Sequence, residues 1–222
     1  MPSDSNPHLH IFDCDGVILN SNRLKISALR SCLESIDSPL SFIEWAEEEF
    51  RTNFGRTRTN HFDIFLRHAE TIGYSITKKV MSEAMLYYSH NVVQLYKDCE
   101  VIEETKRHIK NLPINSLIFV VSASDESELR SILPIKCSKL YSKNIYGGPL
   151  SKVENIKNIL NITKSNKVFF YGDAVQDARA AMSTGIHFFG LKKYSADQKS
   201  LEDFCSLNNL DCFADWSKVV LA

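Results

Sequence analysis

The sequence predicts an α/β fold, in which helices cover a parallel β-sheet and an all-helical segment is inserted after the first strand. Short apolar segments rich in β-branched residues alternate with helical periodicity along the second half of the chain, as in consecutive βαβ units. Residues 21–96, in contrast, contain no strand-like segment, and Pro39 is their only proline. Their apolar residues recur at helical spacing, which predicts four or five helices. We therefore assign residues 1–20 and 97–222 to the core domain and residues 21–96 to an inserted helical domain.

Each element of the core is predicted from its apolar pattern and its flanking residues. Leu9–Phe12 is a short apolar segment that stops at an Asp-Cys-Asp-Gly sequence, which is typical of a buried strand followed by a polar turn. Further strands are expected at residues 117–121, 139–141, 168–171, 186–189 and 212–213. The expected helices cover residues 102–109, 126–133, 153–160 and 175–182, a segment from Asp197 onward, and the C-terminus.

The charge balance of the chain excludes some classes of partner. The 222 residues include 26 Lys and Arg against 27 Asp and Glu. Such a balance creates no overall field that would attract nucleic acid or an acidic membrane surface, so neither is expected as a partner. Any binding of an anion must therefore depend on a local arrangement of side chains.

The cysteines and the N-terminus favour a cytoplasmic protein. The six cysteines are scattered, and none forms a C-x-x-C pair or a Cys/His cluster with zinc-ligand spacing. The first ten residues lack the basic and apolar regions of a signal peptide. No apolar segment approaches the roughly 18 to 20 residues that a membrane span requires.

Two acidic residues follow the first predicted strand. Alternate side chains of an extended chain point the same way, so Asp13 and Asp15 are expected to face one site. Gly16 permits the tight turn that must come next. Turns favour Asp and Gly for local reasons as well, so the pattern alone is weak evidence. Its position directly after a buried strand favours a functional interpretation.

Four more polar residues stand where later strands end or helices begin. Ser122 ends the second strand, Lys152 precedes a helix, and Asp173 and Asp177 surround the start of another helix. Each has a purely structural explanation, since turns use Ser, surfaces use Lys and helix starts favour Asp. In an open α/β sheet, however, ligands bind beyond the carboxyl ends of the strands, where these residues are expected to lie.

The order of these residues resembles that of the haloacid dehalogenase-like hydrolase superfamily. The segments FDCDGV and VVSAS, then Lys152, then YGDAVQD match its four motifs in order, and the resemblance covers residues 9–190. It implies a Rossmann-like core with the helical insert as a cap domain. A branch of that family that includes phosphoglycolate phosphatases and β-phosphoglucomutases has its cap at the same place in the chain.

The resemblance implies a catalytic mechanism and a metal. Asp13 would be the nucleophile that forms an aspartyl-phosphate, and Asp15 the acid that protonates the leaving oxygen. Mg²⁺ would be held by Asp13, the backbone carbonyl of Asp15, and Asp173, with Asp177 acting directly or through water. The charges agree with this, because several carboxylates around a phosphate repel one another unless a cation is present, and oxygen ligands favour Mg²⁺.

The resemblance also indicates which residues hold the phosphate. Ser122, Ala123 and Lys152 would contact the phosphoryl oxygens. A carboxylate at the position of Asp15 favours attack on a P–O bond, because dehalogenases and phosphonatases that are otherwise similar lack it.

The cap contributes candidates for substrate recognition. The sequence Gly55-Arg56-Thr57-Arg58 is similar to a substrate-reading loop of family caps, so Arg58 is the best candidate and Arg56 the next. Arg23 and Lys25 are weaker candidates near the start of the insert. An exposed basic turn is the alternative explanation of the two loop arginines. An anionic or polyhydroxyl substrate would suit them.

Three functions stay open at this point. The leading one is a Mg²⁺-dependent phosphatase that acts on a small phosphorylated metabolite, with sugar phosphate ahead of phosphoglycolate and nucleotide. A phosphosugar mutase of the β-phosphoglucomutase type is the alternative, but it needs a cap lysine, and residues 81–96 contain no convincing one. A catalytically inactive binding module is the third, and the presence of all four motifs argues against it. The sequence does not indicate an oligomeric state.

Overall fold

A central parallel sheet organises the molecule. The computed structural model describes residues 8–165 and 167–219. Six strands pair in the order β3-β2-β1-β4-β5-β6, and every neighbouring pair is parallel. Their bounds are Leu9–Phe12 for β1, Leu117–Asp125 for β2, Ile145–Gly148 for β3, Val168–Gly172 for β4, His187–Leu191 for β5 and Asp211–Phe213 for β6. β1 therefore lies in the interior of the sheet, between β2 and β4.

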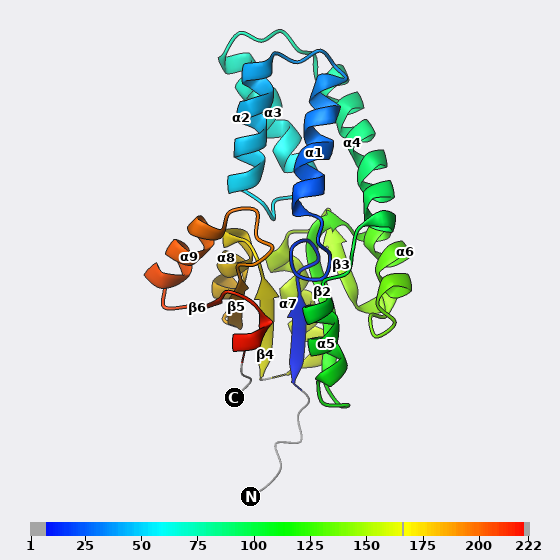
Figure 1. Ribbon diagram of the computed structural model, residues 1–222, viewed down its shortest axis with the longest axis vertical. Coiled ribbons are helices and arrows are strands. Elements are labelled where there is room, and N and C mark those ends of the chain that lie inside the picture. The colour runs from blue at the N-terminus through cyan, green and yellow to red at the C-terminus, as the bar shows by residue number, and fades with distance from the viewer. Residues whose placement is uncertain (1–7, 166, 220–222) are drawn as a thin grey trace, which may run out of the picture.

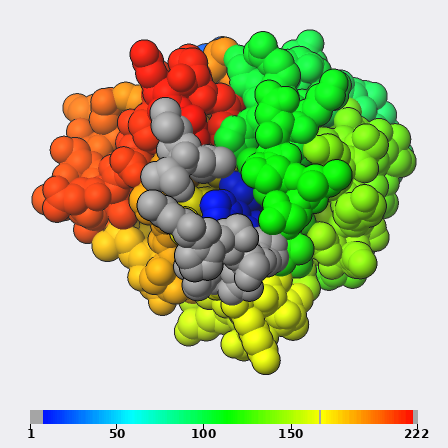
Figure 2. Space-filling view, turned by 90° about the horizontal axis from the view of Figure 1, so that it is seen from below, coloured from blue at the N-terminus to red at the C-terminus, as the bar shows by residue number. Residues whose placement is uncertain are grey.

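Helices cover both faces of this sheet. The helices of the core are α5 (Glu103–Asn111), α6 (Glu126–Lys136), α7 (Lys152–Thr163), α8 (Val175–Thr184) and α9 (Gln198–Leu207). Successive side chains of a strand point to opposite faces, so Ile11 belongs to an apolar cluster that includes residues of α7, α8 and α9, while Phe12 belongs to another cluster that includes residues of α5 and α6. Seen from the end opposite to the insert, the start of β1 is surrounded by later parts of the chain (Figure 2).

The inserted segment forms four helices, which Figure 1 shows together beyond the carboxyl ends of the strands. They are α1 (Asn22–Glu34), α2 (Leu40–Thr52), α3 (Arg58–Thr71) and α4 (Lys78–Asp98). Each contributes a fully buried side chain to one apolar interior: Leu29, Phe42, Phe65 and Tyr88. The exact domain boundaries at residues 20/21 and 96/97 stay a prediction.

Two segments join the insert to the sheet, and they run side by side. The backbone N–H of Asn20 donates to the carbonyl of Glu100 at 3.0 Å, and that of Ile102 donates to the carbonyl of Ile18 at 2.8 Å. Leu19 also forms an antiparallel bridge with Val101. The entering and the leaving chain are therefore hydrogen-bonded to each other directly below the four helices.

The predicted α/β fold with a parallel sheet and a helical insert is confirmed, and the strands Leu9–Phe12, 117–121, 168–171, 186–189 and 212–213 all exist with small shifts at their ends. The expected strand at residues 139–141 is wrong, because the third strand is β3. The glycines of β3 suggest a turn, but they are needed for close packing: a Cβ on Gly147 would lie 2.5 Å from the carbonyl oxygen of Ser124.

Two further corrections concern strand and helix ends. The second strand does not end at Ser122, since β2 continues to Asp125 with an irregular register after Val121. The expected C-terminal helix is, as far as Val219, only the 3-10 turn Trp216–Lys218. Among the described residues, no helix combines the length and apolar character needed to cross a membrane.

Candidate active site

The candidate site lies where β1 and β4 end side by side. Asp13 and Asp173 directly follow these two strands, which are hydrogen-bonded neighbours. The backbone N–H of Asp13 donates to the carbonyl of Tyr171 at 2.9 Å and extends the pairing to the edge of the site. Both carboxylates are buried. The parallel register of two adjacent strands is therefore what brings together residues that are 160 positions apart in the chain.

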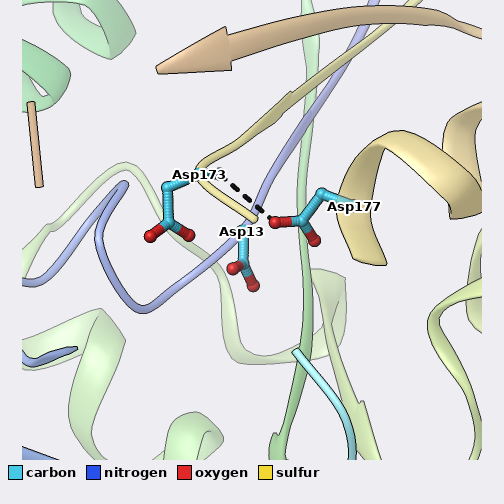
Figure 3. Close-up of side chains that lie close together, drawn as sticks. All are labelled: Asp13, Asp173 and Asp177. Carbon is cyan, nitrogen blue, oxygen red and sulfur yellow. Dashed lines mark hydrogen bonds between the residues drawn. The ribbon is translucent and has the colours of Figure 1, made fainter. Parts of the chain in front are cut away.

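Three carboxylates form one cluster at this place. An oxygen atom of each of Asp13, Asp173 and Asp177 lies within 4.8 Å of the other two. Figure 3 shows the three side chains converging from the ends of β1 and β4 and from the first turn of α8. All three are buried, so water can screen their mutual repulsion only weakly.

The electrostatics of the cluster fit a divalent cation. Burial raises the pKa of Asp13 to about 7, the negative charge of Asp177 adds to this, and Lys152 opposes it. Burial, and then the Asp13 and Asp177 charges, raise the pKa of Asp173 well above its ordinary value. Among the described residues, no donor hydrogen-bonds to the buried Oδ1 atom of Asp173. A buried carboxylate oxygen with no protein donor, beside two further carboxylates, is a suitable ligand for Mg²⁺.

Lys152 supplies positive charge from the protein itself. It is the first residue of α7, where Ser151 and Glu154 form a capping box that fixes the start of the helix. Its Nζ atom lies 2.9 Å from Oδ1 of Asp13 and also contacts Asp177. Burial alone would lower the pKa of Lys152, but these two carboxylates raise it above its ordinary value. The lysine is therefore charged and is placed to neutralise carboxylates.

Asp177 shapes the loop that carries Asp173. Its Oδ2 atom accepts hydrogen bonds from the backbone N–H groups of Asp173 at 3.2 Å and Ala174 at 3.1 Å, and the first of these is drawn in Figure 3. Its Oδ1 atom is the one that contacts Lys152. This loop conformation requires glycine at position 172, because a Cβ there would lie 2.4 Å from Cβ of Asp177. Both oxygens of Asp177 thus have donors, which suits a contribution to a metal site through water.

Gly16 and Asn22 complete the surroundings of Asp173. Gly16 has a φ of +74°, and a Cβ there would lie 2.2 Å from Oδ2 of Asp173. The side-chain amide of Asn22 donates to the same oxygen at 2.6 Å and to the carbonyl of Tyr194 at 2.8 Å. Asn22 was not predicted, since nothing in its local pattern indicates that the first residue of α1 reaches the loop after β4.

Asp15 does not join the cluster of three, because its side chain has other partners. It accepts hydrogen bonds from Ser21 at 2.6 Å, Lys25 at 2.9 Å, Tyr96 at 2.9 Å and Ser124 at 3.0 Å. Burial alone would raise the pKa of Asp15, but the Lys25 ammonium and the hydroxyl donors lower it below its ordinary value. The metal contact through its backbone carbonyl stays a prediction.

Two of these partners lie on helices of the insert, Lys25 on α1 and Tyr96 on α4. Tyr96 was not recognised in the sequence, and Lys25 was only a weak candidate. A signal does exist for Lys25: it lies on the same helical face as the buried Leu29 and Cys32, where a charged residue is unusual unless it has a buried partner.

The predicted phosphate-binding residues line the space between these acids. Ser122 and Ala123 border a cavity of about 20 Å³ together with Asp13, Asp15 and Lys152. The Ser122 hydroxyl accepts a hydrogen bond from the backbone N–H of Ser124 at 3.2 Å and is buried. A cavity of that size holds about one water molecule. A larger cavity of about 380 Å³ adjoins it and shares the lining residues Gly55, Arg56, Ala123 and Lys152.

The two cap arginines are both engaged with carboxylates. Arg56 borders the cavity and forms an ion pair with Glu49 of α2 at 2.9 Å. Arg58, the preferred substrate contact, instead donates two hydrogen bonds to Glu128 of α6. The structure thus brings Asp13, Asp173, Lys152 and Ser122 to one site, with Asp15 beside them, and places Arg58 at a contact between insert and core.

Comparisons with known proteins give the family of this chain and the structures that share its fold. A family model described as haloacid dehalogenase-like hydrolase matches residues 10–191. A predicted phosphoglycolate phosphatase from Haemophilus somnus superposes with a TM-score of 0.76, at 17% identity and with 97% of each chain covered. A proposed β-phosphoglucomutase from Bacteroides vulgatus gives 0.72, at 15% identity, with 95% of this chain and 85% of the other covered. At such identities these structures show a shared fold. No curated protein sequence matches the chain.

Proposed function

The chain belongs to the haloacid dehalogenase-like hydrolase family, and we propose that it is a magnesium-dependent phosphatase that hydrolyses a small phosphomonoester through an aspartyl-phosphate on Asp13. The observation that supports this most is the set of groups around Asp13. Lys152 and the Asp173 carboxylate lie beside it, and Asp15, whose carboxyl group is hydrogen-bonded, borders the same cavity. A nucleophile, a charge-neutralising group and a proton donor are what phosphoryl transfer requires.

In the first step, an oxygen of the Asp13 carboxylate would attack the phosphorus atom. The P–O bond to the leaving group breaks, and Asp15 donates a proton to the leaving oxygen. In the second step, Asp15 takes a proton from a water molecule, and that water attacks the phosphorus of the aspartyl-phosphate. The P–O bond to Asp13 then breaks, which releases inorganic phosphate and restores both carboxyl groups.

The other residues would hold the phosphoryl group while this happens. The Nζ atom of Lys152 already contacts Asp13 and can bind a phosphoryl oxygen, while Ser122 and the backbone at Ala123 border the same cavity. Mg²⁺, held by Asp13, Asp173 and the backbone carbonyl of Asp15, would supply the positive charge that offsets repulsion between carboxylates and phosphate. Asp177 would support this site by fixing the loop after β4.

A phosphosugar mutase is the second candidate function, and one observation favours it. Residues 81–96 of α4 contain no lysine, but α1 supplies Lys25, whose ammonium reaches Asp15. A mutase must also hold a second phosphoryl group, and the cap arginine suited to that task, Arg58, is neutralised by Glu128. This pairing is why we place the phosphatase first.

Phosphate release from p-nitrophenyl phosphate tests the proposed phosphatase. The wild type and the variant Asp13→Asn are each incubated with this ester, with and without Mg²⁺. The proposal expects Mg²⁺-dependent release of phosphate by the wild type only, and activity of Asp13→Asn equal to wild type would contradict it. A panel of phosphorylated metabolites, with sugar phosphates first, then identifies the substrate.

A separate incubation tests the mutase alternative. The protein is given a sugar 1-phosphate with a trace of its bisphosphate, and isomerisation of the sugar phosphate would indicate a mutase. The small phosphorylated partner and the cytoplasmic location are parts of the same proposal.

A further inference from the structure

We propose that His61 of the insert accepts a hydrogen bond from a hydroxyl group of the substrate, and so selects phosphomonoesters whose leaving group is a hydroxylated alcohol. The inference rests on the proposed function, because it concerns the leaving group of the same reaction. It goes further by assigning the recognition of that group to a residue outside the four motifs and to a single ring nitrogen.

His61 borders the site from the side of the insert. It lies in the first turn of α3, is 1% exposed, and lines the same small cavity as Asp13 and Ser122. The core side of this cavity carries the nucleophile and the proposed phosphate-binding residues, so the insert side is left for the leaving group. This agrees with an in-line displacement, in which the leaving oxygen departs from the side of the phosphorus opposite to the nucleophile.

Glu49 of α2 fixes the ring of His61 and its tautomer. The Nδ1 atom lies 3.1 Å from Oε2 of Glu49, and the other oxygen of that carboxylate accepts hydrogen bonds from Arg56 at 2.9 Å and Asn53 at 3.0 Å. A carboxylate that is paired with a guanidinium accepts and does not donate, so the hydrogen of His61 lies on Nδ1. Burial lowers the pKa of His61 below its ordinary value, although Glu49 opposes this. The ring is therefore neutral, and its Nε2 atom is an acceptor.

This Nε2 atom has no partner from the protein. Across residues 8–165 and 167–219, no backbone or side-chain group donates a hydrogen bond to it. Packing against Phe50, whose ring centroid lies 4.5 Å away, accounts for the burial of the ring but not for an unused acceptor. Buried polar atoms are nearly always hydrogen-bonded, so a donor from a bound molecule would complete the histidine.

The insert side of the cavity favours a hydroxyl over an ammonium group as that donor. Among the described residues of the insert, the charged ones that border the cavity are Lys25 and Arg56, and both are cations. They would repel the ammonium of a phosphorylated amino alcohol, whereas a hydroxyl group is uncharged. Phe50 and Phe54 line the same side, and their apolar rings suit the C–H groups of a carbon chain.

The adjoining cavity of about 380 Å³ has room for the rest of such a leaving group. Pockets of roughly 300 to 1,000 Å³ are typical of small-molecule sites. Its lining includes uncharged polar side chains that can exchange hydrogen bonds with further hydroxyl groups, among them Thr57, Asn60 and Gln176. The size and the lining therefore agree with a short polyol or a sugar.

Two esters of equal chain length test the inference. Both sn-glycerol 3-phosphate and n-propyl phosphate have a three-carbon leaving group, and only the first carries hydroxyl groups. We measure kcat/KM for both esters with the wild type, His61→Asn and His61→Gln. The asparagine amide reaches the position of Nδ1 and can still bind Glu49, whereas the glutamine amide reaches the position of Nε2.

The wild type should prefer glycerol 3-phosphate. In His61→Asn this preference should fall by about two- to tenfold, which is the effect of one hydrogen bond between uncharged groups. His61→Gln should recover part of it. His90→Asn, which changes an exposed histidine of α4, is the matched control and should keep the full preference.

The outcomes separate the inference from the proposed function. If the wild type hydrolyses no ester with Mg²⁺, including p-nitrophenyl phosphate, the proposed function fails. If it is active but shows no preference for glycerol 3-phosphate, or prefers O-phosphoethanolamine, the recognition of a hydroxyl group is refuted. An equal loss on both esters in His61→Asn would show that His61 is structural only. Should this variant fail to fold in a thermal unfolding scan, His61→Phe fills the same space beside Phe50 and Phe65 without an acceptor and tests the same ratio.

Discussion

The guanidinium group of Arg58 binds the carboxylate of Glu128 through two hydrogen bonds of 3.0 and 2.8 Å, and this pair joins the first turn of α3 in the insert to α6 in the core. Both side chains are mostly buried, at 17% and 15% exposure. A bidentate pair in such surroundings is geometrically specific and stronger than an exposed ion pair. It therefore acts as a contact that holds the insert against the core.

This contact predicts a pattern in a double-mutant cycle. Arg58→Met and Glu128→Gln should each lower kcat/KM for a phosphate ester by about ten- to a hundredfold, because a hydrogen bond to a charged group contributes about 1.5 to 3 kcal/mol. The double variant should be no worse than the single ones. If Arg58 reads the substrate instead, Arg58→Met will lose activity while Glu128→Gln keeps it.

The carboxylate cluster predicts that Mg²⁺ binds through Asp173. Asp173→Asn should weaken Mg²⁺ binding at least tenfold in isothermal titration calorimetry, because it replaces a charged ligand of the cluster by a neutral one. Asp203→Asn, an exposed aspartate of α9, is the matched control and should bind as the wild type does. Unchanged affinity in Asp173→Asn would place the ion elsewhere.

The raised pKa of Asp13 predicts how stability depends on pH. The carboxyl group titrates at about 7 in the folded protein against 3.8 ordinarily, so between these values the folded state keeps a proton that the unfolded chain has lost. The corresponding stability is complete below pH 4 and is lost as the pH rises through 7.

Thermal unfolding in EDTA should therefore show a midpoint that falls between pH 5 and pH 8. Mg²⁺ should reduce that fall, since the cation favours the ionised carboxylates. Asp13→Asn should give a shallower curve in EDTA than the wild type. Equal slopes for both proteins would show that Asp13 does not titrate in this range.

Gly16 offers a test with a close internal control. Gly16→Ala and Gly73→Ala both place a side chain at positive φ, +74° and +70°, which costs about 1 kcal/mol or more in the free energy of unfolding. Only at Gly16 would the new Cβ collide with Asp173, whereas it meets nothing within 4 Å at Gly73. We expect both variants to be less stable, and Gly16→Ala alone to lose Mg²⁺ binding and activity. Normal Mg²⁺ affinity in Gly16→Ala would contradict the close packing around Asp173.

The sequence was sufficient for those parts of the site that depend on strand ends. Asp13 and Asp173 each follow a short apolar segment, and parallel pairing of adjacent strands is enough to place them together. Lys152 was identified through its motif position, and its ammonium lies 2.9 Å from Asp13. These placements follow from the topology of the sheet and need no detail of side-chain packing.

The parts that were not predicted depend on how distant surfaces pack. Tyr96 reaches Asp15 only because α4 returns to the core beside α1, and Arg58 meets Glu128 only because α3 starts above α6. No local periodicity contains that information. The strand β3 was missed for a related reason, since Gly147 reads as a turn residue until the backbone of Ser124 is seen to lie against it.

The paired connections between insert and core have a consequence for turnover. Asn20 is hydrogen-bonded to Glu100 and Ile102 to Ile18. The two connecting segments are therefore coupled and cannot change conformation independently. The insert then has far fewer orientations available than a domain on a single flexible tether would have. Little conformational entropy would therefore be lost if the insert parted from the core and returned to it, and the contacts between them could reform without a long search.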